Sequence, residues 1–250
     1  MFITSSNNNY LIAKKLLEKK YRDEFKLFLI DGEKLIFDAL KCNVEITSCF
    51  VDINKKTKYN KIIQNIDNVY EMEEKNIKQL TTAITPQGII AICKLNEFEL
   101  SAPIGKALIL ENIQDPNNIG AILRTAVAAD YKDVYLCNCA DVYSLKCIRS
   151  GMSAQFLLNL YNCSIDEAVK INNDNFMLCA DMEGEDVFNI INIPNKHTIV
   201  LGNEGQGVSN YLRNECKKTV SIKMQNGLNS LNVAVSAGII MYALSNRAKN

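Results

Sequence analysis

The sequence lacks a net charge, because 28 Lys and Arg residues balance 28 Asp and Glu residues. No global field therefore draws the protein to nucleic acid or to a membrane, and such binding must come from local patches. It also lacks any run near the roughly 20 apolar residues of a membrane span, and asparagines rather than an apolar core follow its first residues. We expect a soluble cytoplasmic protein that does not contact a membrane.

Histidine is almost absent, since His197 is the only one in the chain. A Ser-His-Asp or Cys-His hydrolase is therefore a poor interpretation. The nine cysteines are odd in number and irregularly spaced, which favours free thiols in a reducing compartment over disulfides. Cys137 and Cys139 form a C-x-C pair with no second pair at zinc spacing. We expect no metal site.

Alternating strand and helix patterns are present along most of the chain. Residues 1–96 predict a small α/β domain, 97–104 a linker that contains Pro103, and 105–250 a second α/β domain. Its apolar strands suit a parallel sheet covered on both faces. In this second domain, strands are expected at 107–112, 133–138, 156–160, 176–181, 197–202 and 218–224, and helices at 118–130, 144–150, 165–173, 208–216 and 230–247.

The first motif is a strand, a turn and a helix over residues 107–129. Asp115-Pro116 ends the strand, and Asn117 and Asn118 are good helix N-caps. Asn118 lies at the helix mouth, where backbone N–H groups favour anions, and Arg124 leans back toward small residues of the same helix. A phosphate or a ribose could fit there. The alternative is a capping asparagine and a surface arginine.

The second motif is a buried strand that runs into the glycine-rich turn 202–207. Gly202, Gly205 and Gly207 permit positive φ and a close approach of a ligand to the backbone. The spacing matches neither a dinucleotide fingerprint nor a phosphate loop, so a nucleotide hydrolase is disfavoured. Glu204 would suit a ribose hydroxyl, a cation or pairing with Arg124; the alternative is a solvated turn acid.

The third motif is a strand, an Asn226-Gly227 turn and a mostly apolar helix over residues 221–244. A helix that is apolar nearly all round is buried in a core or a subunit interface. Ser230 can cap this helix. Asn232 lies in its first turn, where a buried amide would need partners.

A basic segment covers residues 10–22. It contains four cations that we expect to bind RNA, and its apolar residues predict an amphipathic helix. These cations are Lys14, Lys15, Lys19 and Arg22. The alternative is a solvated face.

Taken together and in this order, the three motifs resemble those of the SpoU/TrmH-type RNA ribose 2′-O-methyltransferases of the SPOUT superfamily. The matching stretches are Asp-Pro-Asn-Asn-Ile-Gly-Ala-Ile-Leu-Arg-Thr-Ala, Leu-Gly-Asn-Glu-Gly-Gln-Gly-Val-Ser and Leu-Asn-Ser-Leu-Asn-Val-Ala-Val-Ser-Ala. The front of the chain resembles the L30e-like substrate-binding domain of the ribosomal-RNA-directed branch. Two positions depart from the family pattern: Asp130 stands where a glycine is usual, and Ser150-Gly-Met-Ser153 reorders the usual Ser-Met-Gly.

The resemblance implies a parallel sheet between helices with a deep trefoil knot, and a homodimer packed through the knot and the last helix. It implies methylation of an RNA ribose 2′-OH with S-adenosylmethionine, with ribosomal RNA favoured over transfer RNA. The catalytic residues carried over are Asn118, Arg124, Glu204, Ser230 and Asn232. The cofactor residues carried over are Leu201, Gly202, Asn203, Gly207, Ile222, Met224 and Leu231.

The expected mechanism positions the 2′-OH and removes its proton. Arg124 is a poor base, because a guanidinium holds its proton with a pKa above about 12. We expect it to bind the adjacent phosphate and stabilise the developing alkoxide, while the proton leaves to water or Glu204. The alternatives are a non-catalytic RNA-binding or ribosome-assembly protein on the same fold, and a transfer-RNA 2′-O-methyltransferase.

Overall fold

The computed structural model describes residues 1–225 and 230–245, which form two compact units. One unit comprises residues 1–96 and 141–156, and the other 97–140 and 157–250. The division expected from the sequence differs, because it placed 141–156 in the second domain and treated 97–104 as a separate linker. The predicted Asn226-Gly227 turn and the end of the last predicted helix lie outside the described residues.

The first unit is built on a sheet with strand order β1-β4-β2-β3. β4 is antiparallel to β1 and β2, and β3 is parallel to β2. Alternate residues of the strands enter two apolar cores, with Phe28 and Ile30 in one and Leu29 in the other. The strands are β1 (Leu27–Asp31), β2 (Ile46–Asp52), β3 (Val69–Met72) and β4 (Ile89–Lys94).

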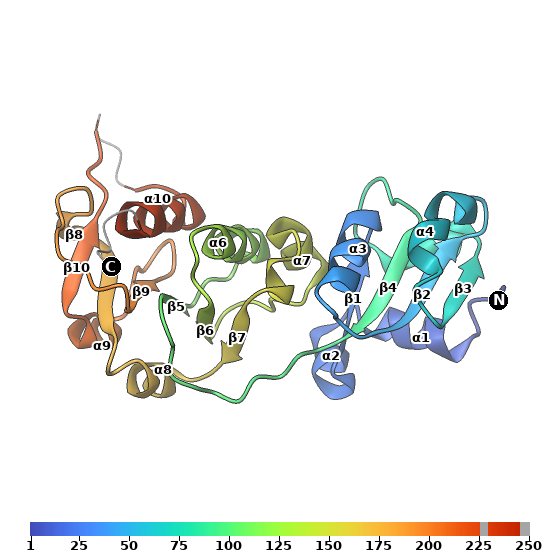
Figure 1. Ribbon diagram of the computed structural model, residues 1–250, viewed down its shortest axis with the longest axis horizontal. Coiled ribbons are helices and arrows are strands. Elements are labelled where there is room, and N and C mark those ends of the chain that lie inside the picture. The colour runs from blue at the N-terminus through green and yellow to red at the C-terminus, as the bar shows by residue number, and fades with distance from the viewer. Residues whose placement is uncertain (226–229, 246–250) are drawn as a thin grey trace. The chain divides into compact units, whose positions relative to one another are not determined.

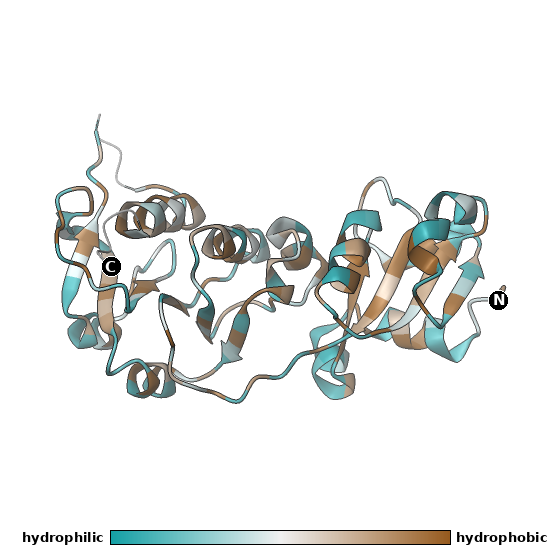
Figure 2. Cartoon of the chain, in the orientation of Figure 1, coloured by the Kyte–Doolittle hydropathy of each residue, from teal (hydrophilic) through white to brown (hydrophobic). Residues whose placement is uncertain are grey.

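Helices and short turns of 3₁₀-helix surround this sheet, whose strands are apolar (brown in Figure 2). The helices are α1 (Asn8–Lys15), α2 (Lys19–Phe25), α3 (Glu33–Lys41), α4 (Asn60–Ile63), α5 (Glu74–Ile77) and α7 (Leu145–Gly151). The 3₁₀ turns are η1 (Lys56–Tyr59), η2 (Lys78–Leu80) and η3 (Ala154–Phe156).

Residues 141–156 complete the first unit although they come late in the chain. Ile148 of α7 is fully buried in one of its cores, and the ring of Tyr143 lies 5.0 Å from that of Phe28. Ser153 donates a hydrogen bond to Asp38 at 2.7 Å. The helix predicted at 144–150 is therefore present, but it packs in the first unit rather than in the second domain, where the sequence had placed it.

The basic segment forms two helices rather than the single one predicted. The chain leaves α1 at Leu16 and starts α2 at Lys19. This turn lets the guanidinium of Arg22 donate to the carbonyl of Leu16 at 2.5 Å, and both residues are buried. The prediction of one continuous helix was wrong, because hydrophobic periodicity does not reveal a turn that accommodates a buried side-chain hydrogen bond.

The second unit contains a six-stranded sheet with strand order β10-β8-β9-β5-β6-β7 among its described residues (Figure 1). Every neighbouring pair in it is parallel, which confirms the predicted α/β class and parallel sheet. The trefoil knot stays a prediction. The strands are β5 (Ala107–Glu111), β6 (Asp133–Cys137), β7 (Asn159–Asn162), β8 (Phe176–Asp186), β9 (His197–Leu201) and β10 (Lys218–Ser221).

Helices cover both faces of this sheet. On one face α6 packs against α10, as Figure 1 shows, and on the other α8 and α9 cover an apolar core. A capping box opens α8, with Ser164 and Glu167 bonded reciprocally. The helices are α6 (Pro116–Ala128), α8 (Ile165–Ile171), α9 (Asn210–Glu215) and α10 (Val233–Ser245).

The start of α6 differs from the prediction. Asp115, not Asn117 or Asn118, is the N-cap, and its carboxylate accepts the Asn117 N–H at 3.0 Å. Pro116 takes the first helical position, where its fixed φ suits the helix and its missing N–H costs nothing. Asn118 is thereby released from capping.

Both departures from the family pattern fall on left-handed backbone. Asp130 has φ 61°, and Met152 and Ser153 have φ 47° and 73°. Glycine is the residue that adopts this conformation without strain, so the non-glycine residues at these three positions carry a small conformational cost. No helix described in residues 1–225 and 230–245 is long and apolar enough to cross a bilayer.

Candidate active site

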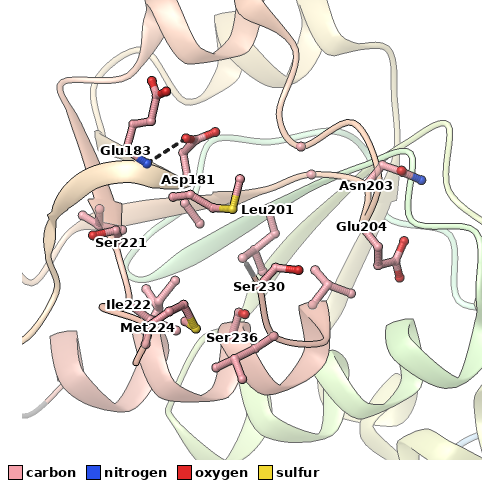
Figure 3. Close-up of a pocket in the computed structure, with 18 of the residues that line it drawn as sticks. Asp181, Glu183, Leu201, Asn203, Glu204, Ser221, Ile222, Met224, Ser230 and Ser236 are labelled. Carbon is pink, nitrogen blue, oxygen red and sulfur yellow. Dashed lines mark hydrogen bonds between the residues drawn. The ribbon is translucent and has the colours of Figure 1, made fainter. Parts of the chain in front are cut away.

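A pocket of about 820 Å³ opens at the carboxyl ends of the strands of the second unit (Figure 3). Five segments of the described chain line it: the glycine loop (residues 202–207) after β9, residues 220–224 at the end of β10, the stretch from Ser230 into α10, part of β8, and Arg213 of α9. Its volume falls in the usual range for small-molecule sites. Ligands of open α/β sheets bind at this edge.

Every residue that the resemblance assigned to the cofactor lines this pocket. The set combines the backbone of the glycine loop with apolar side chains from β9, the end of β10 and the segment before α10. It consists of Leu201, Gly202, Asn203, Gly207, Ile222, Met224 and Leu231. The fold therefore brings together residues from the second and third motifs, while their role in binding stays a prediction.

The glycine loop is a tight turn in which the backbone closes on itself. Gly207 N–H donates to the Asn203 carbonyl at 2.8 Å, and Gly207 has φ 70°. A Cβ built on Gly202 would lie 2.2 Å from the backbone of Gly207, so no side chain fits there. The Asn203 side chain accepts the Gly205 N–H at 2.8 Å. Glycine is required at residue 202 because another part of the backbone approaches it closely, whereas the sequence had indicated the close approach of a ligand.

Three predicted catalytic residues form one hydrogen-bonded chain next to the pocket. The Asn118 amide donates to Oε1 of Glu204 at 2.5 Å, and the Asn232 amide donates to Oδ1 of Asn118 at 3.0 Å. Asn118 comes from α6, Glu204 from the glycine loop and Asn232 from the residue before α10. The suggested pairing of Glu204 with Arg124 is absent in the described part of the chain, where Asn118 takes its place.

The cap of α10 is Asn232 rather than Ser230. Its side-chain oxygen accepts the N–H groups of Ala234 at 2.9 Å and Val235 at 3.4 Å. The suggested cap at Ser230 was wrong because α10 begins at Val233, three residues later than expected. Ser230 instead lines the pocket (Figure 3). Residues 226–229, including Asn229 of the third motif, lie outside the described residues.

Arg124 is not part of the hydrogen-bonded chain that joins Asn118, Glu204 and Asn232. It is exposed on α6 and is not among the described residues that line the pocket. Within residues 1–225 and 230–245 its guanidinium has no hydrogen bond or ion pair. An exposed guanidinium with unused N–H donors can donate hydrogen bonds to an anionic ligand.

Part of β8 forms a wall of the pocket that the sequence did not predict. β10 pairs Thr219 with Cys179 and then Val220 with Glu185, so residues 180–184 leave the ladder as a bulge. This β8 bulge brings Asp181, Met182 and Glu183 to the pocket. A Cβ on Gly184 would lie 2.5 Å from the Val220 backbone. A glycine inside a strand pattern is the signal that could have indicated it.

An ion pair ties the β8 bulge to α9. Arg213 of α9 also lines the pocket, and its guanidinium binds the Asp181 carboxylate. Asp181 further accepts the Glu183 N–H at 3.1 Å, drawn as a dashed line in Figure 3. Glu183, Glu204 and Lys223 add exposed charges to the lining. The pocket therefore offers apolar contacts together with both signs of charge.

The predicted RNA-binding residues of the first unit do not all face solvent. Lys14, Lys15 and Lys19 are exposed, whereas Arg22 is 6% exposed. Arg22 donates through Nε to Asp141 at 2.7 Å and lies 2.5 Å from the same carboxylate through Nη2. The expectation that Arg22 binds RNA was wrong, because its donors are committed inside the unit.

Among the described residues, no group of three or more His, Cys, Asp or Glu side chains could hold a metal ion. His197 is fully buried and bonded to the Tyr131 hydroxyl at 2.8 Å and the Pro194 carbonyl at 2.7 Å. Burial lowers the pKa of His197. His197 is therefore a core residue, and it is not among the described residues that line the pocket.

Both parts of the chain match families of known proteins. Residues 105–242 match the family model described as SpoU rRNA Methylase family, and residues 10–91 match the MRM3-like substrate binding domain. The 23S rRNA (guanosine(2553)-2′-O)-methyltransferase RlmP of Bacillus subtilis (strain 168) is 30% identical over 242 residues, which cover 92% of this chain and 93% of RlmP. The mitochondrial rRNA methyltransferase 3 of Xenopus laevis is 33% identical over 152 residues, covering 56% of this chain and 36% of that protein.

Solved structures share the fold over nearly the whole chain. A crystal structure of an RNA 2′-O ribose methyltransferase has a TM-score of 0.85 and 25% identity, covering 99% of both chains. The AdoMet-bound rRNA methyltransferase of Sinorhizobium meliloti has a TM-score of 0.87 at 23% identity, covering 100% of this chain and 99% of that one, a likeness of fold alone. Because a family model covers more than half of the sequence and RlmP aligns along nearly all of both chains, the protein belongs to the SpoU rRNA methylase family.

Proposed function

We propose that the protein transfers the methyl group of S-adenosylmethionine to a ribose 2′-hydroxyl of ribosomal RNA. The observation that carries this proposal is the hydrogen-bonded chain of Asn118, Glu204 and Asn232 beside a pocket lined by all the expected cofactor residues. Its nearly full-length similarity to RlmP, named as a 23S rRNA guanosine 2′-O-methyltransferase, supports this substrate and reaction.

The pocket residues fit a sulfonium nucleoside. The glycine loop closes on itself at Gly202 and Gly207, so the main chain rather than side chains forms this part of the pocket lining. Leu201, Ile222 and Met224 provide apolar surface, and the lining carboxylates complement a cation. When bound, the cofactor supplies a methyl group already activated on sulfur.

The chain's own residues would then position the ribose hydroxyl and remove its proton. The Asn118 amide holds the Glu204 carboxylate, and Asn232 fixes the Asn118 amide from the other side. A carboxylate with a fixed orientation can accept a proton directly or through water. Positioning of this kind supplies several kcal/mol, up to roughly 7–11.

Arg124 would act on the RNA backbone rather than on the cofactor. Its exposed guanidinium is suited to bidentate binding of a phosphate next to the target ribose. From there its charge would stabilise the alkoxide that develops as the proton leaves. This role requires the RNA to extend from the pocket toward α6.

The first unit would hold the RNA outside the catalytic pocket. Lys14, Lys15 and Lys19 are exposed, and Lys15 Nζ lies 5.4 Å from the centre of the Tyr21 ring. Cations next to an aromatic ring suit phosphate and base contacts of single-stranded RNA. A ribosomal-RNA substrate is consistent with the predicted cytoplasmic location, which stays a prediction.

The proposed functional form is a homodimer packed through the knot and α10. This helix buries one side in its own unit, yet Val235 is 51% exposed and Tyr242 47% exposed. Large apolar side chains on the outer face of an apolar helix favour a second copy of the chain. Light scattering should report a dimer, which Val235→Glu weakens; a monomeric wild type would contradict this form.

Calorimetry with S-adenosylmethionine, followed by transfer of a labelled methyl group to ribosomal RNA, tests the function. Binding and transfer to a ribose, mapped as one 2′-O-methyl site lost in a deletion strain, are the expected results. A chain that binds RNA but neither binds the cofactor nor transfers methyl would be a non-catalytic RNA-binding or ribosome-assembly protein. Transfer to transfer RNA alone would correct the substrate.

A further inference from the structure

Glu111, the last residue of β5, carries a buried carboxylate that the proposed chemistry does not use. It is 1% exposed, and its Oε2 accepts the backbone N–H of Ser209 at 2.8 Å. Its Oε1 is buried and has no hydrogen-bond partner in the described part of the chain. Burying a carboxylate with half of its acceptors unused is costly. Stability alone therefore does not account for a charged residue here.

The end of β5 holds both ends of the segment that contains Glu204. Beyond the Glu111 bond to Ser209, the carbonyl of the next residue, Asn112, accepts the Asn203 side-chain N–H at 3.0 Å. Between these two anchors the loop is closed by its own hydrogen bonds. Two contacts with one strand end therefore hold the loop to the sheet, in addition to the bond from Asn118 to Glu204.

The Ser209 anchor also acts on a second wall of the pocket. Ser209 is the N-cap of α9, with its hydroxyl accepting the Leu212 N–H at 3.4 Å. On the same short helix, Arg213 binds Asp181 of the β8 bulge. A shift of Ser209 would therefore be transmitted both to the glycine loop and, through α9, to the bulge.

We infer that Glu111 is a positioning residue for the proposed methyl transfer. Its carboxylate oxygen holds the Ser209 amide and so fixes the glycine loop and α9 in the arrangement that forms the cofactor pocket. The inference rests on the proposed function for its consequence in catalysis. What matters is the reach of the acceptor atom to Ser209, more than the negative charge.

Two variants separate reach from charge. Glu111→Gln keeps an acceptor oxygen at the same distance and removes the charge, whereas Glu111→Asp keeps the charge and withdraws the acceptor by one methylene. The matched control is Asp133→Asn, a 4% exposed carboxylate on the neighbouring strand β6 whose partners, Asn159 and Tyr161, lie in β7. Each full-length protein is measured for thermal unfolding, for the dissociation constant of S-adenosylmethionine, and for hydrogen exchange of residues 203–209.

Glu111→Asp should weaken S-adenosylmethionine binding by about tenfold or more, equivalent to roughly 1.4 kcal/mol. It should also speed exchange at Ser209, while Glu111→Gln stays close to wild type in both. Asp133→Asn should lower the melting temperature without changing the dissociation constant. A purely structural role for Glu111 would make its variants behave like this control.

The inference is overturned if Glu111→Asp binds the cofactor as wild type does, or if Glu111→Gln is the more damaging change. Failure of the wild-type protein to bind S-adenosylmethionine would instead refute the proposed function. In that case the exchange measurement still decides on Glu111, because protection of the Ser209 amide does not depend on a cofactor.

Discussion

The side-chain amide of Asn118 donates a hydrogen bond to Oε1 of Glu204 at 2.5 Å, across 86 positions of the sequence. This contact joins the start of α6 to the glycine loop, and Asn232 extends it to the start of α10. Each of the three residues taken alone could be an ordinary turn or capping residue. Their mutual bonding makes a shared role in positioning the substrate the better explanation.

Asn118→Ala should reduce the rate of methyl transfer more than it reduces cofactor affinity. Loss of the amide frees Glu204 and Asn232 together, and a hydrogen bond to a charged group corresponds to about tenfold to a hundredfold in rate. Single-turnover transfer and calorimetry measure the two effects. Asn117→Ala, on the adjacent exposed asparagine, should be silent. An equal loss of rate in the Asn118→Ala and Asn117→Ala variants would contradict a positioning role for the hydrogen-bonded chain of residues.

Arg124→Ala should abolish turnover and leave S-adenosylmethionine binding nearly intact. The reason is that Arg124 is exposed and lies outside the lining of the pocket. Arg124→Lys should retain part of the activity, since it keeps the charge but not the planar fork that binds phosphate. If the alanine variant lost cofactor binding, the assignment of Arg124 to the RNA would be refuted.

Gly202→Ala should weaken cofactor binding by at least about tenfold, because overpacking a tight site costs on the order of 1–3 kcal/mol. The added methyl would lie 2.2 Å from Gly207, so the glycine loop has to move. Gly205→Ala in the same loop is the control, since its added methyl meets only the Asn203 side chain, at 3.4 Å. Equal effects of Gly202→Ala and Gly205→Ala on the dissociation constant would contradict this explanation.

Arg22→Ala should lower stability, not RNA affinity. The guanidinium is buried against Asp141, and removal of one partner of a buried pair costs about 3–5 kcal/mol. Lys19→Ala should do the reverse, with weaker RNA binding and unchanged unfolding, because Lys19 is exposed. Denaturant unfolding and RNA titration at fixed salt distinguish them. A stable Arg22→Ala protein with weak RNA binding would restore the discarded prediction.

Stability should decrease as the pH falls below 6.5, because His197 is held neutral in the fold. Burial lowers the pKa of His197 below its ordinary value of 6.5, so the unfolded chain takes up the proton first. The contribution is complete above pH 6.5 and is lost below it, with a slope of up to roughly 1.4 kcal/mol per pH unit. Urea unfolding between about pH 7.5 and 5.5 measures it. His197→Gln should flatten the profile; an unchanged slope would assign it to another group.

Local patterns were sufficient for much of the fold. Alternation of apolar strands with helices predicted the α/β class and the parallel sheet of the second unit. Two boundaries differ from the prediction: Pro116 opens α6 with Asp115 as its N-cap, and the basic segment turns between α1 and α2, where the buried Arg22 contacts Leu16 and Asp141. A contact such as that with Asp141 depends on a partner that a short window of sequence does not contain.

The bulge at residues 180–184 and the transfer of 141–156 to the first unit illustrate the same limit. Gly184 is compatible with an ordinary strand until Val220 lies against it, and Ile148 gives a helix pattern whichever core it enters. Neither Gly184 nor Ile148 indicates by itself which residues it will pack against. Only the packed chain determines that Asp181 faces the pocket and pairs with Arg213.

The sequence by itself determined the α/β class, the approximate places of the strands and helices and the three motifs, because these follow from patterns within a few residues. The tertiary structure alone decided that Asn118, Glu204 and Asn232 bond to one another, that Arg22 is buried, and that Glu111 holds Ser209. The physical reason is that side-chain pairing between distant segments depends on how the elements pack, and packing is a property of the whole chain rather than of any one stretch.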